Sequence, residues 1–468
     1  MNKFKLEDVK QKLKNNCDVR YRDIRCDGEN VHLIYIDNLC NPREISSYII
    51  EPLLLRMKRT DDLDTIMHSL VESSNAAELL DLEECIKYVL SGYVAVLFPH
   101  LKKAFYCNVK GYKKRSIEIP QTETVIKGPR EGFTEDLQDN LSGIRRRIKS
   151  DKLKVEYFEL GRSSRTGTVM LYIDGVAPER IVNYVRNKIQ LIDRDYVIYL
   201  NYIEDSLKSR FTPFDTIGFT EKPDVAASKL IDGRIIVIMD NNSFVMTAPY
   251  FFIENFQTSD DYTLNPYMAN MGRLLRWIAF GMSVLIPGIY LALITYHYKL
   301  VPSIFLYRMA IFRAGVPVPT VVELLYMTVF FQIIREAGVR LPQPIGPTLS
   351  IVGALILGEA AVTSGLASQV TVVIVAISSI ASYLVPNLHA PIFVWEIFII
   401  IMASLTGLPG FYTGFVLFVA HLAGLTTCGY PYLFPLGTLK KFRFKDTILR
   451  GNLMEVSRHR MPEDENND

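Results

Sequence analysis

The sequence predicts an α/β soluble half made of two similar subdomains, followed by an all-α polytopic transmembrane domain of four to six helices. Lys, Arg, Asp and Glu are dense in the first 272 residues and sparse between Leu274 and Pro435. A block of sequence recurs within the charged half, and several apolar runs approach the roughly 20 residues that a spanning helix needs. The predicted divisions are subdomain 1 with a connector helix (1–149), subdomain 2 (150–272), a transmembrane channel domain (273–437) and a basic cytoplasmic tail (438–468).

Composition excludes several classes of function. A net charge of +2 gives no bulk attraction to nucleic acid, so no nucleic-acid partner is expected. The six cysteines show no metal-ligand spacing, and no cofactor or metal site is predicted. No serine-hydrolase, zinc-protease or phosphate-loop motif is present, so we do not expect an enzyme. The N-terminal residues lack the apolar core of a signal peptide, which favours a cytoplasmic soluble half.

The soluble half contains an internal repeat. Residues 31–50 and 169–185 each give an apolar run ending in Tyr-Ile-Asp, then a proline-containing loop and an amphipathic segment. A second pair of blocks, 87–98 and 228–240, gives a helix end, a glycine (Gly92; Gly233) and a buried-type strand. Two blocks in the same order favour duplicated α/β subdomains over chance similarity.

A connector helix is predicted between the two subdomains. Thr134 is the expected N-cap, with acidic residues in the first turn. Arg145, Arg146 and Arg147 follow near its far end, where we expect a solvated basic cluster that could also touch anionic head groups.

The second half contains six candidate spans. They are residues 274–296, 318–334, 348–362, 366–384, 391–405 and 410–426. Six spans are favoured. The segment 318–334 contains Glu323 and is the weakest, and four spans is the alternative if this segment lies on the surface and the central region spans once. Residues 299–313 are short and basic, which predicts an interfacial segment. The basic tail after Pro435 predicts a C-terminus on the cytoplasmic side, and both termini on one side require an even number of spans.

Two long motifs carry a family resemblance. EIPQTETVIKGPREGFTEDLQDNLSGIRRRI (118–148) and RLPQPIGPTLSIVGALILGEAAV (340–362) resemble signatures of the GerA family of spore germination proteins. That family includes the A subunits of nutrient germinant receptors and the related SpoVAF proteins. The resemblance implies the inner spore membrane, partner B and C subunits, and a homo-oligomer, by this resemblance a pentamer, that forms an ion channel in the lipid bilayer. The alternatives are a SpoVAF-type accessory channel and a non-conducting scaffold or transporter component.

One apolar segment contains the candidate pore lining. Val352, Ile356, Glu359 and Thr363 share a helix face by their i, i+3 and i+4 spacing. A carboxylate inside an apolar stretch is costly unless it faces protein or water. A ring of such carboxylates in an oligomer would favour cations. The competing interpretation is a Glu359 that is hydrogen-bonded within one subunit.

A proline-rich break precedes that segment. Pro342, Pro344 and Pro347 fix the backbone and remove donors, so they are hinge candidates that would aim the pore helix. An ordinary loop between spans is the alternative. His389 and His421 lie in or near spans and are expected to be structural. Glu396 follows Trp395 near the start of a span, where we expect it to reach the interface.

Overall fold

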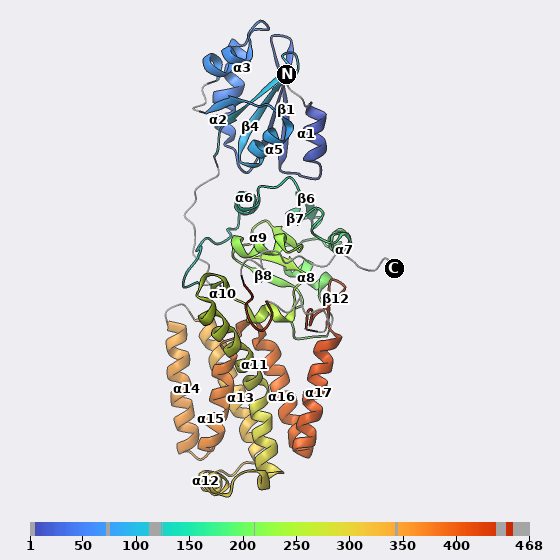
Figure 1. The fold of residues 1–468 in the computed structure, drawn as a ribbon. Coiled ribbons are helices and arrows are strands. Elements are labelled where there is room, and N and C mark those ends of the chain that lie inside the picture. The colour runs from blue at the N-terminus through green and yellow to red at the C-terminus, as the bar shows by residue number, and fades with distance from the viewer. Residues whose placement is uncertain are drawn as a thin grey trace.

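The computed structural model describes residues 5–71, 75–111, 123, 125–209, 211–341, 345–436 and 446–452. It is an elongated molecule in which subdomain 1, subdomain 2 and a helical bundle follow one another along the long axis (Figure 1).

Subdomain 1 is an antiparallel five-stranded sheet with helices packed against it. The strands in spatial order are β1 (Val19–Cys26), β2 (Glu29–Ile36), β4 (Tyr93–Phe98), β5 (Lys103–Asn108) and β3 (Ala76–Glu78). The helical elements are α1 (Leu6–Lys12), α2 (Pro42–Ile45), η1 (Ser46–Ile50), α3 (Glu51–Arg56), α4 (Leu63–Thr65), η2 (Ile66–Leu70) and α5 (Leu82–Leu90). The central strand β4 is buried along almost its whole length, because helices cover both of its faces.

Subdomain 2 has the same strand order. It reads β6 (Leu153–Leu160), β7 (Thr166–Ile173), β9 (Ile235–Met239), β10 (Val245–Ala248) and β8 (Gly218–Thr220). Its helices are α6 (Leu137–Arg147), α7 (Glu179–Gln190), α8 (Asn201–Leu207) and α9 (Pro223–Ile231). Helix α6, predicted as the connector at the end of the first division, packs against this sheet, since Leu141 and Ile144 share a core with Val155 of β6. β2 and β7, which lead into the two Tyr-Ile-Asp motifs, both occupy the second place. The predicted duplication is therefore confirmed by topology.

The two predicted glycine positions are equivalent as well. Gly92 follows α5 and Gly233 follows α9, each one residue after the C-cap. Their φ angles are +82° and +91°, in the left-handed region where a side chain would be strained. Each glycine lets the chain reverse directly from a helix into a buried strand.

The predicted N-cap of the connector helix was wrong, and the predicted solvated basic end holds for the exposed Arg146 but not for Arg145. Asp136 caps α6, and its carboxylate accepts from the backbone N–H groups of Gln138 and Asp139 at 2.8 and 3.1 Å. The Thr134 hydroxyl instead accepts from Asp136 N–H, one step before the helix. Arg145 is not solvated: its side chain is fully buried in an ion pair with Asp18 of subdomain 1. The charged carboxylate of Asp136 accepts hydrogen bonds from the first backbone N–H groups of α6 more strongly than the neutral hydroxyl of Thr134 would.

Among the described residues, the predicted membrane half is an up-and-down bundle of six helices. They are α11 (Pro266–Thr295), α13 (Thr320–Arg340), α14 (Ile345–Thr363), α15 (Gln369–Ser382), α16 (His389–Thr406) and α17 (Leu408–Gly424). Helix α12 (Ser303–Arg313) lies across the end remote from the soluble half (Figure 1). Shorter elements are η3 (Phe252–Phe256), α10 (Asp260–Thr263), η4 (Tyr298–Leu300), η5 (Pro386–Leu388), β11 (Thr426–Thr427) and β12 (Tyr430–Pro431).

Each of the six predicted spans corresponds to one of these helices. By length and composition, two helices of the described chain could cross a membrane: Pro266–Thr295 and Pro386–Thr406. Three shorter apolar helices accompany them, over Val352–Thr363, Gln369–Ser382 and Leu408–Gly424. The structure thus supports a membrane domain, and four to six spans remains a prediction.

Candidate functional site

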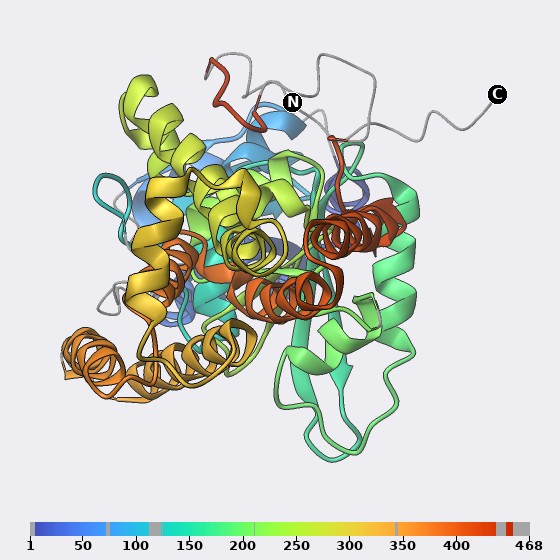
Figure 2. The ribbon, with the colours of Figure 1, turned by 90° about the horizontal axis from the view of Figure 1, so that it is seen from below.

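The predicted pore-lining stripe lies on the outer face of α14. Val352, Ile356, Glu359 and Thr363 are all exposed in the single chain, and α14 stands at the edge of the bundle (Figure 2). The structure therefore brings the four residues together on one uncovered surface.

Small residues form the opposite face of α14. A Cβ added at Gly353 would lie 3.6 Å from Ile334 of α13, and one added at Gly358 would lie 3.4 Å from Val372 of α15. Ala361 is buried in the core of the bundle. The helix thus turns its glycines inward for close packing and its larger apolar side chains outward.

Glu359 lies close to one end of α14. It is one turn before the helix ends at Thr363, on the side remote from the soluble half. The Thr363 hydroxyl is satisfied locally, since it donates to the Glu359 carbonyl oxygen at 2.9 Å. The Glu359 carboxylate has no hydrogen-bond or ion-pair partner among the described residues, so within one chain this charge faces outward.

The structure describes one of the three hinge candidates, Pro347. Pro342 and Pro344 lie outside the described residues. Pro347 lies in the first turn of α14, where a missing N–H leaves no helical bond unmade. The hinge stays a prediction.

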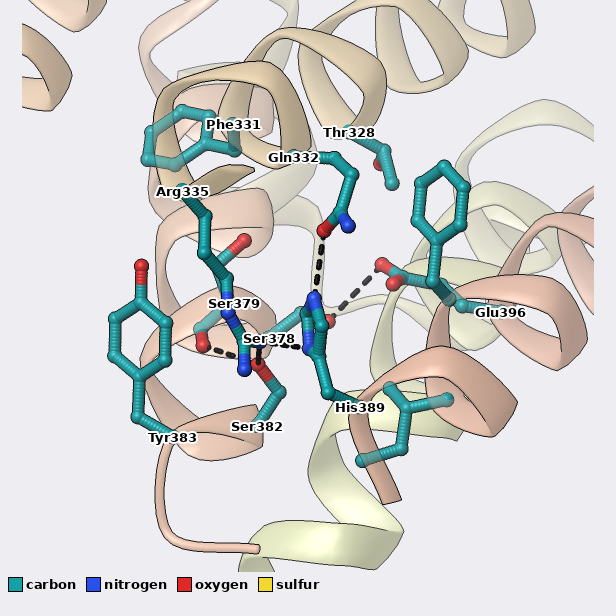
Figure 3. A pocket seen from close by; sticks show the side chains of 12 residues that line it. Thr328, Phe331, Gln332, Arg335, Ser378, Ser379, Ser382, Tyr383, His389 and Glu396 are labelled. Carbon is teal, nitrogen blue, oxygen red and sulfur yellow. Dashed lines mark hydrogen bonds between the residues drawn. The ribbon is translucent and has the colours of Figure 1, made fainter. Parts of the chain in front are cut away.

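A polar cavity lies inside the bundle between α13, α15 and α16 (Figure 3). Its volume is about 20 Å³, which is room for one water molecule. Its wall includes five side chains that are charged or strongly polar, namely Gln332, Arg335, Ser378, His389 and Glu396. Such groups are costly in an apolar bundle unless they bind one another or water.

The side chains of this cavity connect α13 to α16 through His389. Arg335 contacts His389 Nδ1, and His389 Nε2 lies 2.7 Å from Gln332 Oε1. Arg335 also donates to Ser382 Oγ at 3.2 Å and lies 4.9 Å from the centre of the Tyr383 ring. Both ring nitrogens of His389, at the start of α16, thus have partners on α13.

Glu396 closes the other side of the cavity. Ser378 Oγ lies 3.0 Å from Glu396 Oε1 and 2.8 Å from the carbonyl oxygen of Ser283 in α11. A hydroxyl has one hydrogen, so it can satisfy only one of these acceptors at a time. Glu396 is buried, and the prediction that it could reach the interface is not supported.

Sequence reasoning did not find this cavity. Thr328, Gln332 and Arg335 share one face of α13 by i+4 and i+3 spacing, and Ser378 and Ser382 share one of α15. That periodicity was available as a signal. It does not show which helices pack together, and so it could not bring Arg335 next to His389.

Glu323 of α13 is fully buried near the opposite end of the bundle from this cavity. Its Oε1 accepts from the backbone N–H of Ser368 at 2.5 Å, at the start of α15. The positive end of a helix dipole stabilises a carboxylate there. This contact joins α13, which corresponds to the weakest predicted span, to the start of α15 inside the bundle.

The soluble half and the bundle are joined by a buried charge cluster. Arg273 of α11 donates from Nε to Asp261 at 3.1 Å and from Nη1 to Asp446 of the tail at 2.8 Å. Tyr262 donates to the second Asp446 oxygen at 2.7 Å. Burial, followed by the charge of Asp446, raises the pKa of Tyr262. The chain therefore leaves the bundle at the end where it entered.

A second buried cluster lies beneath subdomain 2. Glu254 accepts hydrogen bonds from both Lys229 and Arg234. Burial opposes ionisation of Glu254, but the guanidinium of Arg234 and the ammonium of Lys229 outweigh it and lower the pKa of this carboxyl. Glu254 thus forms ion pairs with both Lys229 and Arg234 in a region from which water is excluded.

Within the described part of the chain, no group of three or more His, Cys, Asp or Glu side chains could hold a metal ion. His421, the other membrane histidine, contacts Thr212 of subdomain 2 at 3.0 Å.

Comparison with known proteins gives the family. Residues 7–461 match the family described as Bacillus/Clostridium GerA spore germination protein. The chain belongs to the GerA family. It is 35% identical to spore germination protein KA of Bacillus subtilis strain 168 over 95% of this chain and 83% of that protein. It is 34% identical to the uncharacterized membrane protein YfkQ of the same strain, over 91% of this chain and 84% of that protein.

A solved structure is also similar. The N-terminal domain of the A subunit of the Bacillus megaterium spore germinant receptor GerK3 is 23% identical, with a TM-score of 0.39. The match covers 53% of this chain and 94% of that one. The expected family is confirmed by the whole-chain match, and the named relatives include a spore germination protein and a membrane protein.

Proposed function

We propose that this chain is the A-type membrane subunit of a spore germinant receptor and contributes α14 to a nutrient-gated cation channel. The role is non-enzymatic, in the inner spore membrane, with both termini on the core side and with B and C subunits as partners. The chain would assemble as a homo-oligomer, by family resemblance a pentamer.

One observation carries the channel proposal: the outer face of α14 combines uncovered apolar side chains with an unpaired carboxylate. An acidic side chain at the centre of a bilayer costs roughly 2.5–3.5 kcal/mol on insertion scales, and less toward the interface. Glu359 is one turn from the helix end, so its natural place is the mouth of a water-filled lumen. Ile356 would lie one turn deeper, where a ring of apolar side chains can gate by dewetting.

Flux measurements in proteoliposomes containing this chain and its partner subunits test the proposal. Ile356→Ala should leak cations without nutrient, because a smaller ring no longer excludes water. Val416→Ala on α17 is the matched control, since Ile356 and Val416 are each 61% exposed in the single chain. Glu359→Gln should reduce cation preference without changing assembly, whereas Glu336→Gln, on an exposed carboxylate paired with Arg340, should not.

The competing functions give different results. If Ile356→Ala and Glu359→Gln assemble normally and conduct as the parent protein does, α14 is a packing helix. A parent protein that assembles without any flux would favour a scaffold. Saturating, slow flux would favour a carrier.

A further inference from the structure

Helix α12 is an uncovered element at the end of the bundle remote from the soluble half. Figure 1 shows it end-on at the foot of the bundle, and Figure 2, from below, shows it lengthwise. Its axis thus lies across the direction of the long helices. None of its residues is buried.

Its exposed face is apolar around a single charge. Ile304, Phe305, Ile311 and Phe312 surround the exposed Arg308, by i+3, i+4 and i+7 spacing. Phe305 and Ile304 are 60% and 71% exposed. The half-buried side of the helix carries Leu306, Met309 and Arg313, and Met309 packs against the core of the bundle.

The charge of this region is unusual for its place. Residues 296–319 contain Lys299, Arg308 and Arg313 and no acid. Lys and Arg are normally concentrated in cytoplasmic loops, whereas this elbow lies on the far side of the bundle from the soluble half. Basic residues next to a membrane surface are attracted to anionic lipid head groups.

We propose that α12 is an interfacial helix that binds the leaflet remote from the soluble half, with Arg308 on an anionic lipid phosphate. The occupant is lipid because α12 leads directly into α13, whose exposed large side chains near that end, Val322, Val329 and Phe330, are all apolar. The membrane-facing surface therefore continues onto α12. Aromatic and aliphatic side chains insert at the boundary of head groups and acyl chains, while an arginine among them extends to the phosphates. The inference requires a bundle that crosses a membrane and does not depend on ion conduction.

Depth measurement tests the apolar part. The full chain, with the exposed Cys17 replaced by Ser, carries a nitroxide at Phe305→Cys in vesicles of POPC mixed with the anionic lipid POPG. We expect relaxation by oxygen to exceed relaxation by a water-soluble nickel chelate. A nitroxide at Arg165→Cys, in the exposed β6–β7 turn, should show the reverse. Nickel access equal to that control would overturn the proposal, as would shielding from both agents, which would indicate a covering protein.

Lipid exchange tests the charge. Arg308→Gln should lower the affinity for POPG about fivefold, the effect of one basic residue near a charged membrane surface. Arg340→Gln, at the opposite end of α13, is the control for overall charge and should retain affinity. Bound POPG is counted by native mass spectrometry of the purified chain. Unchanged POPG binding in a well-folded Arg308→Gln variant would overturn the phosphate contact.

Discussion

The buried ion pair between subdomains gives the sharpest test of the fold. Arg145 of α6 donates to both Asp18 oxygens at 2.9 Å, to Asn16 Oδ1 at 2.7 Å and to the Leu153 carbonyl at 3.3 Å. The side chains of Arg145 and Asp18 are 0% and 2% exposed. Removing one partner of such a pair leaves a buried charge and costs about 3–5 kcal/mol. We therefore expect Asp18→Ala to weaken subdomain 1 docking by that amount.

The chain provides a matched control for this measurement. Arg162 and Asp193 form a similar two-point pair, at 2.9 and 2.5 Å, but their side chains are 69% and 70% exposed. Asp193→Ala should cost about 0–1 kcal/mol. The full chain is titrated with urea in detergent, and the rate of trypsin cleavage between the subdomains reports how much of subdomain 1 has undocked. The shift of this transition gives the free-energy cost of each of the two substitutions. Equal effects of the two substitutions would refute the assignment of Arg145 as a buried anchor.

Three further predictions concern packing, the tail and pH. Gly288→Ala in α11 would place a Cβ 2.6 Å from Ile399 Cγ2 of α16, so thermal unfolding should show a loss of about 1–3 kcal/mol, whereas Gly281→Ala, with nothing within 4 Å, should show none. Asp446→Ala should speed trypsin cleavage after the buried Arg450, and the exposed Asp205→Ala should leave the cleavage rate unchanged. The pKa of Glu254 is lowered in the folded chain, so ionised Glu254 stabilises the folded state. This contribution to the free energy of unfolding is complete above the ordinary pKa of 4.5 and is lost as pH falls through the lower pKa of the folded state. The difference in melting temperature between parent and Glu254→Gln should shrink over that acidic range; a difference independent of pH would contradict the assignment.

Sequence periodicity was sufficient to predict the elements that depend on local physics. The repeat, the glycines after α5 and α9, and the six bundle helices all follow from hydrophobic pattern and backbone preference, which act over a few residues. The predictions are wrong where the environment of a residue depends on a partner that is distant in the sequence. Arg145 resembles a solvated helix end until Asp18, more than a hundred residues away in sequence, is placed against it.

The contacts of the polar side chains inside the bundle could not be predicted from the sequence for the same reason. Glu396 and His389 were assigned individually, near an interface and as a structural residue, because the pairing of α13 with α15 and α16 is not encoded in any short segment. Once those helices meet, Arg335 contacts His389 and Ser378 reaches the carboxyl group of Glu396. The stripe on α14 could be predicted because its four residues need only one helix.

The duplicated subdomains differ in how they connect to the membrane, which bears on how a signal could travel. The core of subdomain 2 includes Phe251 and Cys428, so the segment that follows α17 is part of its packing. Thr427 of that segment donates to the Thr216 carbonyl at 2.6 Å, and Tyr250 N–H donates to Thr427 Oγ1 at 3.1 Å. Subdomain 1 makes no comparable contact with the bundle among the residues described. Its link to subdomain 2 combines the buried Arg145 pair with a backbone bridge between residues 15–17 and Val155 of β6. A partner that pulled on subdomain 1 would therefore act through α6 and β6 first, and Asp18→Ala should reduce any response to such a partner while leaving the response to one bound at subdomain 2 intact.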